Sequence, residues 1–258
     1  MRLAQRIVGA EVLDALDRDD PIAQRARRDL QRVHRAMATR SVLAPAVRAL
    51  RPAPHGGGRA LQILELGAGD GSLLLGVARA LGPRIAPVAL TLLDRHDLLS
   101  QSTVQAFATV GWQARAQVCD VFDWVRGEEK RSFRGTEPNP TWDLVCANLF
   151  LHHFDAEPLA RILRAVRNCA HSVFAVEPRR SWLALAGSHL IGAIGASAVT
   201  RGDAILSVRA GFRASEITQL WSAPPGAWEL RECPAGLFSH CFQARRVARV
   251  RGVDEPRR

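Results

Sequence analysis

A largely apolar strand, a glycine-rich turn and an apolar helix follow one another directly near residue 65, and this unit constrains the fold most. Leu61–Leu66 has the pattern of a buried strand. The turn is Gly67-Ala68-Gly69-Asp70-Gly71, and the expected helix is Ser72–Leu81. Glycines allow a backbone to turn sharply and to approach a ligand where a Cβ atom would clash. The unit therefore predicts a nucleotide-side cradle in an α/β sheet.

The chain after this unit continues to alternate strands with helices. Further buried strands are expected at residues 88–94, 114–118, 142–148 and 172–177, and a terminal strand pair at 228–232 and 238–245. Helices are expected at residues 104–110, 159–169 and 215–220, and a polar, charged loop at 126–141. This alternation predicts an α/β fold with a doubly wound, mostly parallel seven-stranded sheet.

The two ends of the α/β unit suggest additional parts. Residues 1–50 show helical spacing, and Asp20-Pro21 indicates a helix N-cap and first turn. Gly56-Gly57-Gly58 then predicts a flexible entry. We therefore expect an N-terminal helical cap over residues 1–55 and a core domain over 56–258. Residues 180–206, rich in Leu, Ile and small residues, fall outside the alternation and predict a helical lid insertion; a membrane span is the alternative on length alone.

The composition restricts the classes of partner. A chain of 258 residues with 47% hydrophobic content can form one large core. The net charge of +10 favours anionic partners, but Lys130 is the single lysine among 35 basic residues and tyrosine is absent, which indicates a compositional bias. Nucleic acid is therefore an unlikely partner. The five cysteines form no C-x-x-C pair, so no metal site is expected, and the absence of a signal-peptide pattern predicts a cytoplasmic protein without a transmembrane segment.

The charge of the glycine turn distinguishes between nucleotide cofactors. A dinucleotide-binding turn reads G-x-G-x-x-G/A, whereas here the third glycine comes one residue early and Ser72 follows it. Glu65 and Asp70 would repel a pyrophosphate, by roughly 1 kcal/mol for each close like-charge pair. S-adenosylmethionine carries a cationic sulfonium and a cationic amino group, which the same carboxylates attract. The turn therefore favours S-adenosylmethionine over NAD.

Polar residues stand where the expected strands end. They are Glu65, Asp94, Asp120, Asn148 and Glu177. Because ligands of doubly wound sheets bind outside the carboxyl ends of the strands, these side chains predict the position of the site without any motif.

With these residues in place, the chain resembles a class I S-adenosylmethionine-dependent methyltransferase over residues 60–178 and, by strand order, to 245. A less specific similarity is to bacterial small-molecule methyltransferases of polyketide and quinone-type pathways, which implies secondary metabolism. The resemblance implies that the turn glycines line the methionine and ribose, that Asp94 accepts from the ribose hydroxyls and that Asp120-Val121 meets the adenine. It places these residues at the cofactor: Glu65, Gly67, Ala68, Gly69, Asp70, Gly71, Asp94, Arg95, Asp120, Val121, Asn148 and Leu149.

Simpler explanations compete at two of these positions. Asp94 can be a turn former at a strand end, and Asp120 can be a helix N-cap. The segment that begins at Asn148 also lacks the Asn/Asp-Pro-Pro-Tyr/Phe motif that methyltransferases of nucleic acids and amino groups often carry there. That departure leaves oxygen or carbon as the atom methylated.

Two adjacent histidines, His152 and His153, are the candidate catalytic residues. An imidazole titrates near neutrality and can remove a hydroxyl proton as the oxygen attacks a methyl group. Since adjacent residues on a helix point about 100° apart, we expect only one of them to face the site, with His153 slightly less favoured. The alternative is that one packs against the helix and the other is exposed. No shared metal ion is expected, because neighbouring histidines on a helix cannot easily bind the same ion.

Together these observations predict an S-adenosylmethionine-dependent methyltransferase. Its acceptor is expected to be a small, apolar or aromatic hydroxylated metabolite, methylated on oxygen or carbon. The alternatives are an RNA or protein methyltransferase, and a non-catalytic binding protein or an NAD-dependent oxidoreductase on the same fold.

Overall fold

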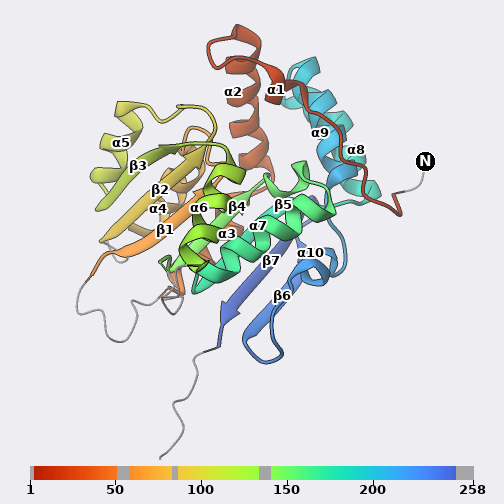
Figure 1. The fold of residues 1–258 in the computed structure, drawn as a ribbon. Coiled ribbons are helices and arrows are strands. Elements are labelled where there is room, and N and C mark those ends of the chain that lie inside the picture. Colours follow the sequence, from red (N-terminus) through yellow and green to blue (C-terminus); the bar gives the residue numbers. More distant parts are fainter. Residues whose placement is uncertain (1–2, 51–58, 83–86, 134–140, 248–258) are drawn as a thin grey trace, which may run out of the picture.

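A seven-stranded sheet forms the centre of the protein in a computed structural model that describes residues 3–50, 59–82, 87–133 and 141–247 (Figure 1). The expected entry at Gly56-Gly57-Gly58 lies outside the described residues. The strand order is β3-β2-β1-β4-β5-β7-β6. The strands are β1 (Leu61–Leu66), β2 (Val88–Asp94), β3 (Trp112–Val118), β4 (Leu144–Asn148), β5 (Ser172–Pro178), β6 (Trp228–Ala235) and β7 (Ser239–Arg246).

The sheet is parallel from β1 to β5, and only β7 runs against its two neighbours, β5 and β6. The predicted mostly parallel, doubly wound sheet with a terminal strand pair is thereby confirmed. β1 and β4 lie side by side at the centre, with Glu65 opposite Cys146. The carboxyl ends of β1, β2 and β4 therefore meet at one edge of the sheet, where the polar residues were expected.

Helices cover both faces of the sheet. The described helical segments are α1 (Val12–Ala15), α2 (Pro21–Ala36), α3 (Thr39–Arg48), α4 (Ser72–Leu81), α5 (Gln101–Ala108), α6 (Val121–Phe133), η2 (Leu151–His153), α7 (Ala156–Cys169), α8 (Trp182–Leu190), η3 (Ile191–Ile194), α9 (Ala198–Ala210) and α10 (Glu216–Leu220). One core joins α6, α7 and α10 to the sheet, and a second joins α3, α4 and α5 to the opposite face. The strands β1, β2, β4 and β5 are buried on both sides, which explains their largely apolar sequences, whereas the residues of the edge strands β3 and β6 are mostly exposed or half-buried.

The helix α2 stands with α8 and α9 beyond the sheet (Figure 1). It begins as predicted, with Pro21 in the first turn and the Asp20 carboxylate accepting from the amide of Ile22 at 2.7 Å. The buried carboxylate of Asp29 accepts from the Ser197 amide at 2.8 Å and from the Thr200 hydroxyl at 3.1 Å. These contacts join α2 to the first turn of α9.

Two sequence predictions about local structure were wrong. Residues 121–133 form helix α6, whereas 126–141 was expected to be a loop; residues 134–140 lie outside the described part. Val121, Trp124 and Val125 face the core at helical spacing, and most charged residues of the helix are exposed, Asp123, Arg126 and Lys130 among them. Residues 3–11 are not helical either, because this stretch runs extended and the amide of Ile7 donates to Arg209 at 3.2 Å.

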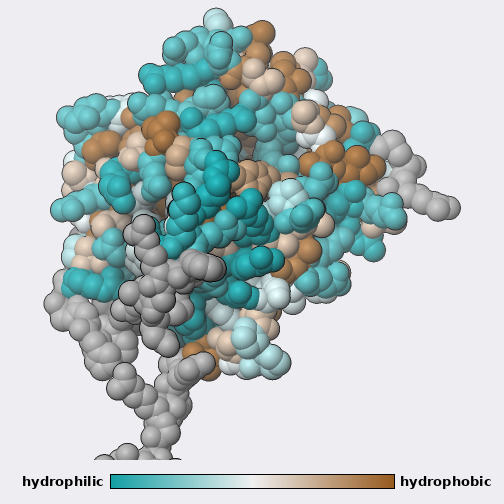
Figure 2. All heavy atoms as spheres, viewed as in Figure 1, coloured by the Kyte–Doolittle hydropathy of each residue, from teal (hydrophilic) through white to brown (hydrophobic). Residues whose placement is uncertain are grey.

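The segment 180–206 consists of α8, η3 and most of α9. None of the helices in the described ranges is long and apolar enough to cross a membrane. Several large apolar side chains of α8 and η3 are nevertheless exposed: Trp182, Leu183, Leu190 and Ile194. Figure 2 shows a hydrophobic area over α8 and α9 on a face that is otherwise mostly hydrophilic.

Candidate functional site

The glycine turn between β1 and α4 requires glycine for two separate reasons. Gly67 and Gly71 have φ angles of +65° and +74°, which side chains of L-residues rarely permit. A Cβ atom on Gly67 would lie 2.2 Å from the ring of Phe150, and one on Gly71 would lie 2.8 Å from Leu92. Gly67 and Gly71 therefore pack against Phe150 and Leu92 too closely for a side chain, whereas a Cβ atom on Gly69, between them, would meet only open space.

That space is a cavity of about 440 Å³ at the carboxyl ends of β1, β2 and β4. Its volume falls in the range of about 300–1,000 Å³ that is typical of ligand pockets. Both candidate histidines and nearly all the predicted cofactor residues line it: Glu65, Gly67, Ala68, Gly69, Asp70, Asp94, Arg95, Asp120, Val121, Asn148 and Leu149. The exception is Gly71, which does not line the cavity and instead packs toward Leu92 at the N-terminus of α4.

Two hydrogen-bond acceptors in this cavity are buried without a partner. Glu65 is only 2% exposed, and its Oε2 atom accepts no hydrogen bond from any described residue. The same holds for Oδ1 of Asn148, whose Nδ2 atom lies 3.2 Å from Nε2 of His34. Burial, with Asp70 and Asp94 nearby, raises the pKa of Glu65 well above its usual range. Because buried polar atoms are nearly always paired, these two predict a ligand that donates hydrogen bonds.

The predicted aspartates of the site also hold the backbone around it. Asp94 accepts from the amides of Gly69 at 2.9 Å and His96 at 3.0 Å, and so joins the glycine turn to the end of β2. Asp120, which is exposed, accepts from the amide of Phe122 at 2.7 Å, as expected for an N-cap. A carboxylate has about four acceptor positions, so these contacts leave room for a ligand. Asp94 therefore stabilises a turn and Asp120 caps a helix, as the simpler explanations predicted, and both side chains still line the cavity.

Asp70 and Arg95 connect the cavity to the N-terminal segment. Asp70 accepts from the Ser72 amide at 3.0 Å and from Nε2 of Gln31, on α2, at 2.7 Å. The Arg95 guanidinium lies 3.3 Å from the Asp14 carboxylate. Residues between positions 11 and 34 thus form one wall of the cavity.

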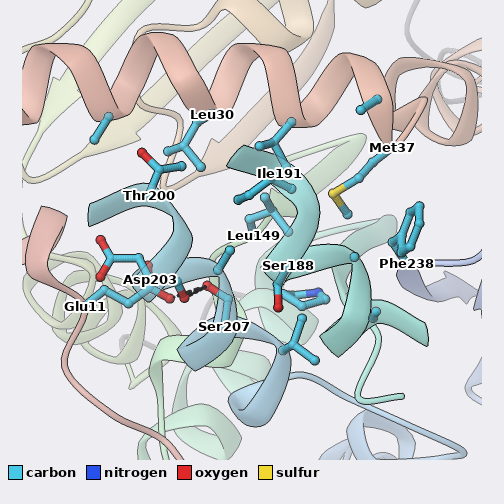
Figure 3. Close-up of a pocket in the computed structure, with 18 of the residues that line it drawn as sticks. Glu11, Leu30, Met37, Leu149, Ser188, Ile191, Thr200, Asp203, Ser207 and Phe238 are labelled. Carbon is cyan, nitrogen blue, oxygen red and sulfur yellow. Dashed lines mark hydrogen bonds between the residues drawn. The ribbon is translucent and has the colours of Figure 1, made fainter. Parts of the chain in front are cut away.

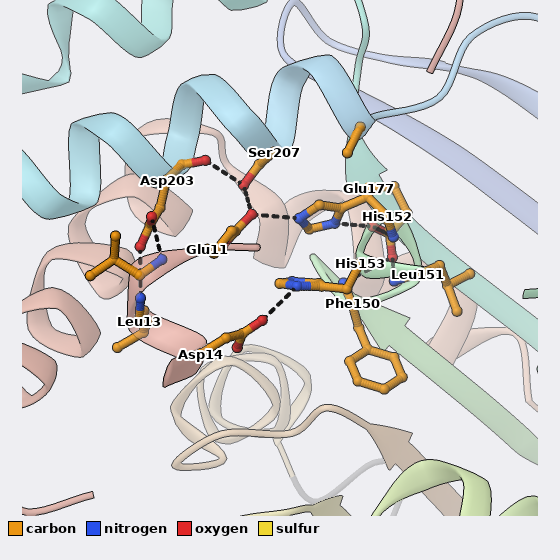
Figure 4. Close-up of polar contacts among 12 residues, drawn as sticks. Glu11, Leu13, Asp14, Phe150, Leu151, His152, His153, Glu177, Asp203 and Ser207 are labelled. Atoms are coloured by element: carbon orange, nitrogen blue, oxygen red, sulfur yellow. Dashed lines mark hydrogen bonds and ion pairs between the residues drawn. The ribbon is translucent and has the colours of Figure 1, made fainter. Parts of the chain in front are cut away.

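His152 is buried between two carboxylates (Figure 4). Its Nδ1 atom lies 2.8 Å from Glu177 at the end of β5, and its Nε2 atom lies 3.3 Å from Glu11. Burial alone would lower the pKa of His152, but Glu11 and Glu177 raise it to about 9. This imidazole is therefore charged at neutral pH and is not available to accept a proton.

His153 lies beside it, with ring centroids 4.3 Å apart, and is more accessible, with 21% of its side chain exposed. Its Nδ1 atom lies 2.9 Å from the Asp14 carboxylate, which fixes the ring orientation. Both histidines line the cavity, so the expectation that only one faces it was wrong. The pair lies on the short turn η2, whose start Glu177 holds by accepting from the Phe150 and Leu151 amides at 3.1 and 2.9 Å. The two rings are oriented by their own contacts, His152 with Glu11 and Glu177 and His153 with Asp14.

A second, apolar cavity of about 140 Å³ adjoins the first, between α2, α8 and α9 (Figure 3). Leu30, Met37, Ile191 and Phe238 are among its walls. Five residues line both cavities: Glu11, Leu13, Leu30, Leu149 and Ser207. Leu149 has a φ angle of +50°, a strained conformation directly at the end of β4. The two cavities thus meet beside the histidines.

Glu11, Asp14 and Ser207 also line the cavity, but no pattern in the sequence predicted them. Glu11 and His152 are 141 positions apart in the chain. No local pattern links them, and the only signal was the unusual number of acidic residues between positions 11 and 20.

No protein-family model matches the sequence, and no curated protein sequence matches it either. Solved structures do resemble the fold. A plantazolicin methyltransferase, BamL, in complex with a triazolic desmethylPZN analog and SAH, is 11% identical, with a TM-score of 0.55 over 90% of this chain and 92% of that one. The mitomycin 7-O-methyltransferase MmcR is 17% identical, with a TM-score of 0.52 over 93% of this chain.

The chain spans 61% of the length of MmcR. At these identities the likeness concerns the fold alone. It confirms the Rossmann-like methyltransferase fold that the strand order and the glycine turn predicted.

Proposed function

We propose that this protein is an S-adenosylmethionine-dependent methyltransferase that acts on a small, apolar or aromatic hydroxylated metabolite. One observation carries the proposal: Glu65 and Asn148, which line the cavity beside the glycine turn, each bury an acceptor atom without a partner among the described residues. The methionine part of the cofactor ends in an ammonium group, which would donate to these atoms. The complex of the similarly folded plantazolicin methyltransferase with SAH supports this assignment.

The remaining walls of the cavity suit the rest of the cofactor. Asp94 would accept from the ribose hydroxyls, and Asp120 with Val121 would contact the adenine. NAD fits less well, because its pyrophosphate would lie against Glu65, Asp70 and Asp94. The cofactor would supply the methyl group as an electrophilic carbon bonded to a sulfonium.

The apolar cavity is the proposed acceptor site. We infer that residues 1–55 form a helical cap over the core domain of residues 56–258 and that residues 180–206 act as a lid. The observations behind this inference are that α2, α8 and α9 line the apolar cavity and that the lid exposes Trp182 and Leu190 by 65% and 69%. An apolar acceptor would enter between these helices, and its hydroxyl group would lie where the cavities meet.

The chemistry is a one-step displacement. An acceptor oxygen or carbon bonds to the methyl carbon, the carbon–sulfur bond breaks, and its electron pair stays on sulfur. The protein contributes alignment and exclusion of water. His153, held by Asp14, is the better-placed imidazole to take the acceptor's proton, since His152 is already charged between Glu11 and Glu177.

Calorimetric titration tests the cofactor assignment. S-adenosylmethionine and S-adenosylhomocysteine should bind the wild type, and Asp94→Ala should weaken both by roughly tenfold or more through lost hydrogen bonds. Asp97→Ala is the matched control, because this carboxylate lies three residues away, is 60% exposed and does not line the cavity. Binding of NAD or a salt-dependent affinity for RNA, without binding of the sulfur ligands, would refute the proposal. An acceptor screen that begins with phenols would follow.

A further inference from the structure

The histidine pair and Glu11 form a cluster of possible metal ligands. One donor atom from each of Glu11, His152 and His153 lies within 4.8 Å of the others. Such a shared site was not expected from the sequence, because adjacent histidines on an α-helix diverge. On the 3₁₀ turn η2 the two rings lie side by side, and Glu11 approaches them from the N-terminal segment (Figure 4).

The distances in this cluster suit a bound ion. Imidazole nitrogens and carboxylate oxygens bind zinc-like ions at about 2.0–2.2 Å, so two donors at a tetrahedral angle lie about 3.3 Å apart. Nε2 of His152 and Oε1 of Glu11 are separated by 3.3 Å. The third donor, from His153, needs to move on the order of 1 Å, which a small rotation of a partly exposed ring provides.

Each proposed ligand is also held from behind. Histidines that bind metals almost always donate their other nitrogen to a carboxylate or carbonyl, which orients the ring. Here Nδ1 of His152 contacts Glu177 at 2.8 Å, and Nδ1 of His153 contacts Asp14 at 2.9 Å. The Ser207 hydroxyl donates to Glu11. Nε2 of His152 faces Glu11, which is itself a proposed ligand, and the second ring nitrogen of His153 is left for the ion.

We propose that Glu11, His152 and His153 bind a divalent transition-metal ion. Two imidazoles and one carboxylate suit Zn²⁺, Fe²⁺ or Mn²⁺ rather than Mg²⁺, which prefers oxygen ligands and retains its water. Three protein ligands leave further coordination positions open, and the cluster lies where the two cavities meet. This site rests on the proposed function. The ion would bind the hydroxyl oxygen of the acceptor and lower the pKa of that hydroxyl group. The hydroxyl proton would then pass to solvent, and His153 would be a metal ligand instead of the base.

Metal binding is measured without any methyl-transfer assay. The full-length protein is stripped with a chelator, dialysed against Zn²⁺ or Co²⁺, and analysed for metal content and for the visible absorption of bound Co²⁺. We expect one ion per chain. Glu11→Gln and His153→Ala should each weaken binding at least tenfold. Asp14→Asn, which removes a charge that orients His153 and also pairs with Arg95, should weaken binding by about 10–100-fold. His189→Ala is the control, because it removes an exposed histidine of α8 outside the cluster.

Binding of S-adenosylmethionine to each stripped variant shows that it is folded and that the cofactor site is intact. Loss of metal with retained cofactor binding supports the proposed metal site. A wild-type protein that binds the cofactor but retains no ion, or retains it equally in Glu11→Gln, overturns the metal site and leaves His153 with Asp14 as a metal-free base. Failure of the cofactor to bind the wild type refutes the proposed function separately, whatever the metal content.

Discussion

The carboxyl group of Glu65 should lose its proton when S-adenosylmethionine binds. Glu65 is 2% exposed, and its Oε2 atom has no partner among the described residues. Burial first, and then the charges of Asp70 and Asp94, raise its pKa well above its ordinary value of 4.5, which favours the protonated form in the free protein. An ammonium group placed against it would stabilise the carboxylate. Binding should therefore release up to one proton per chain.

The substitution Glu65→Gln removes this proton while preserving the shape of the side chain. A charge-assisted hydrogen bond contributes about 1.5–3 kcal/mol, so the dissociation constant should rise roughly ten- to 150-fold. Glu65→Gln should also stabilise the free protein at pH 7, because burial disfavours the carboxylate that the unfolded wild-type chain carries at this pH, whereas glutamine is uncharged in both states. Above pH 4.5 the unfolded chain releases the proton of Glu65, while the folded wild type retains it up to its raised pKa. The wild type should therefore lose stability as the pH rises between these two pKa values, and Glu65→Gln should not.

Calorimetry in buffers of different ionisation enthalpy measures the released proton directly. The apparent binding enthalpy of the wild type should depend on the buffer, and that of Glu65→Gln should not. Glu128→Gln is the control: burial also raises the pKa of Glu128, which is 8% exposed, but this residue lies on α6 outside the cavity. Buffer-independent binding to the wild type, or equal affinity in Glu65→Gln, would show that Glu65 does not receive the ammonium group.

Three other changes probe separate parts of the structure. Gly67→Ala should abolish cofactor binding and lower the free energy of unfolding by about 2–4 kcal/mol, because its Cβ atom would lie 2.2 Å from Phe150. The control is Gly82→Ala, where φ is a similar +63° but the Cβ atom would meet open space. Its cost in a denaturant titration should be only about 1 kcal/mol. Burial lowers the pKa of His34 from 6.5 to about 4, so the unfolded chain takes up a proton at a higher pH than the folded protein does. The wild type should therefore lose on the order of 2 kcal/mol of stability as the pH falls from 6.5 to 4. In His34→Gln this part of the stability–pH curve should be flatter. Ala204→Phe, which fills the apolar cavity of about 140 Å³, should reduce acceptor turnover at least tenfold while cofactor affinity, by calorimetry, changes less than twofold; unchanged turnover would place the acceptor elsewhere.

The sheet was predictable because its signals are local. The apolar runs of β1 and β2 and the glycine turn predicted both strands and α4 with the bounds that the structure has. Because parallel strands end at the same edge of a sheet, the polar residues at the strand ends could be placed together before any tertiary contact was known. Helix α6 was missed, because its many charged residues suggested a loop and its buried face consists of only a few side chains, Val121, Trp124 and Val125 among them.

The two histidines show where sequence reasoning stopped. Their identity marked them as candidates, but their roles depend on which carboxylates surround them. Helical geometry separates adjacent side chains, whereas contacts with Glu11 and Glu177 on one ring and with Asp14 on the other place the two ring centroids 4.3 Å apart at the cavity. The preference for His152 over His153 as a base followed from no physical difference in the sequence. Its contacts with Glu11 and Glu177 now favour the opposite assignment.

The sequence by itself determined the cofactor cradle. The glycine turn, Glu65 and Asp94 lie next to their own strands, and short-range periodicity with parallel strand pairing is enough to bring them together. Only the tertiary structure decided the other half of the site. Glu11 reaches His152 because residues 3–11 extend along α9, and the apolar cavity exists because α2 packs against α9 through the buried Asp29. Contacts between segments so far apart in the chain depend on packing in three dimensions, which no local pattern of residues records.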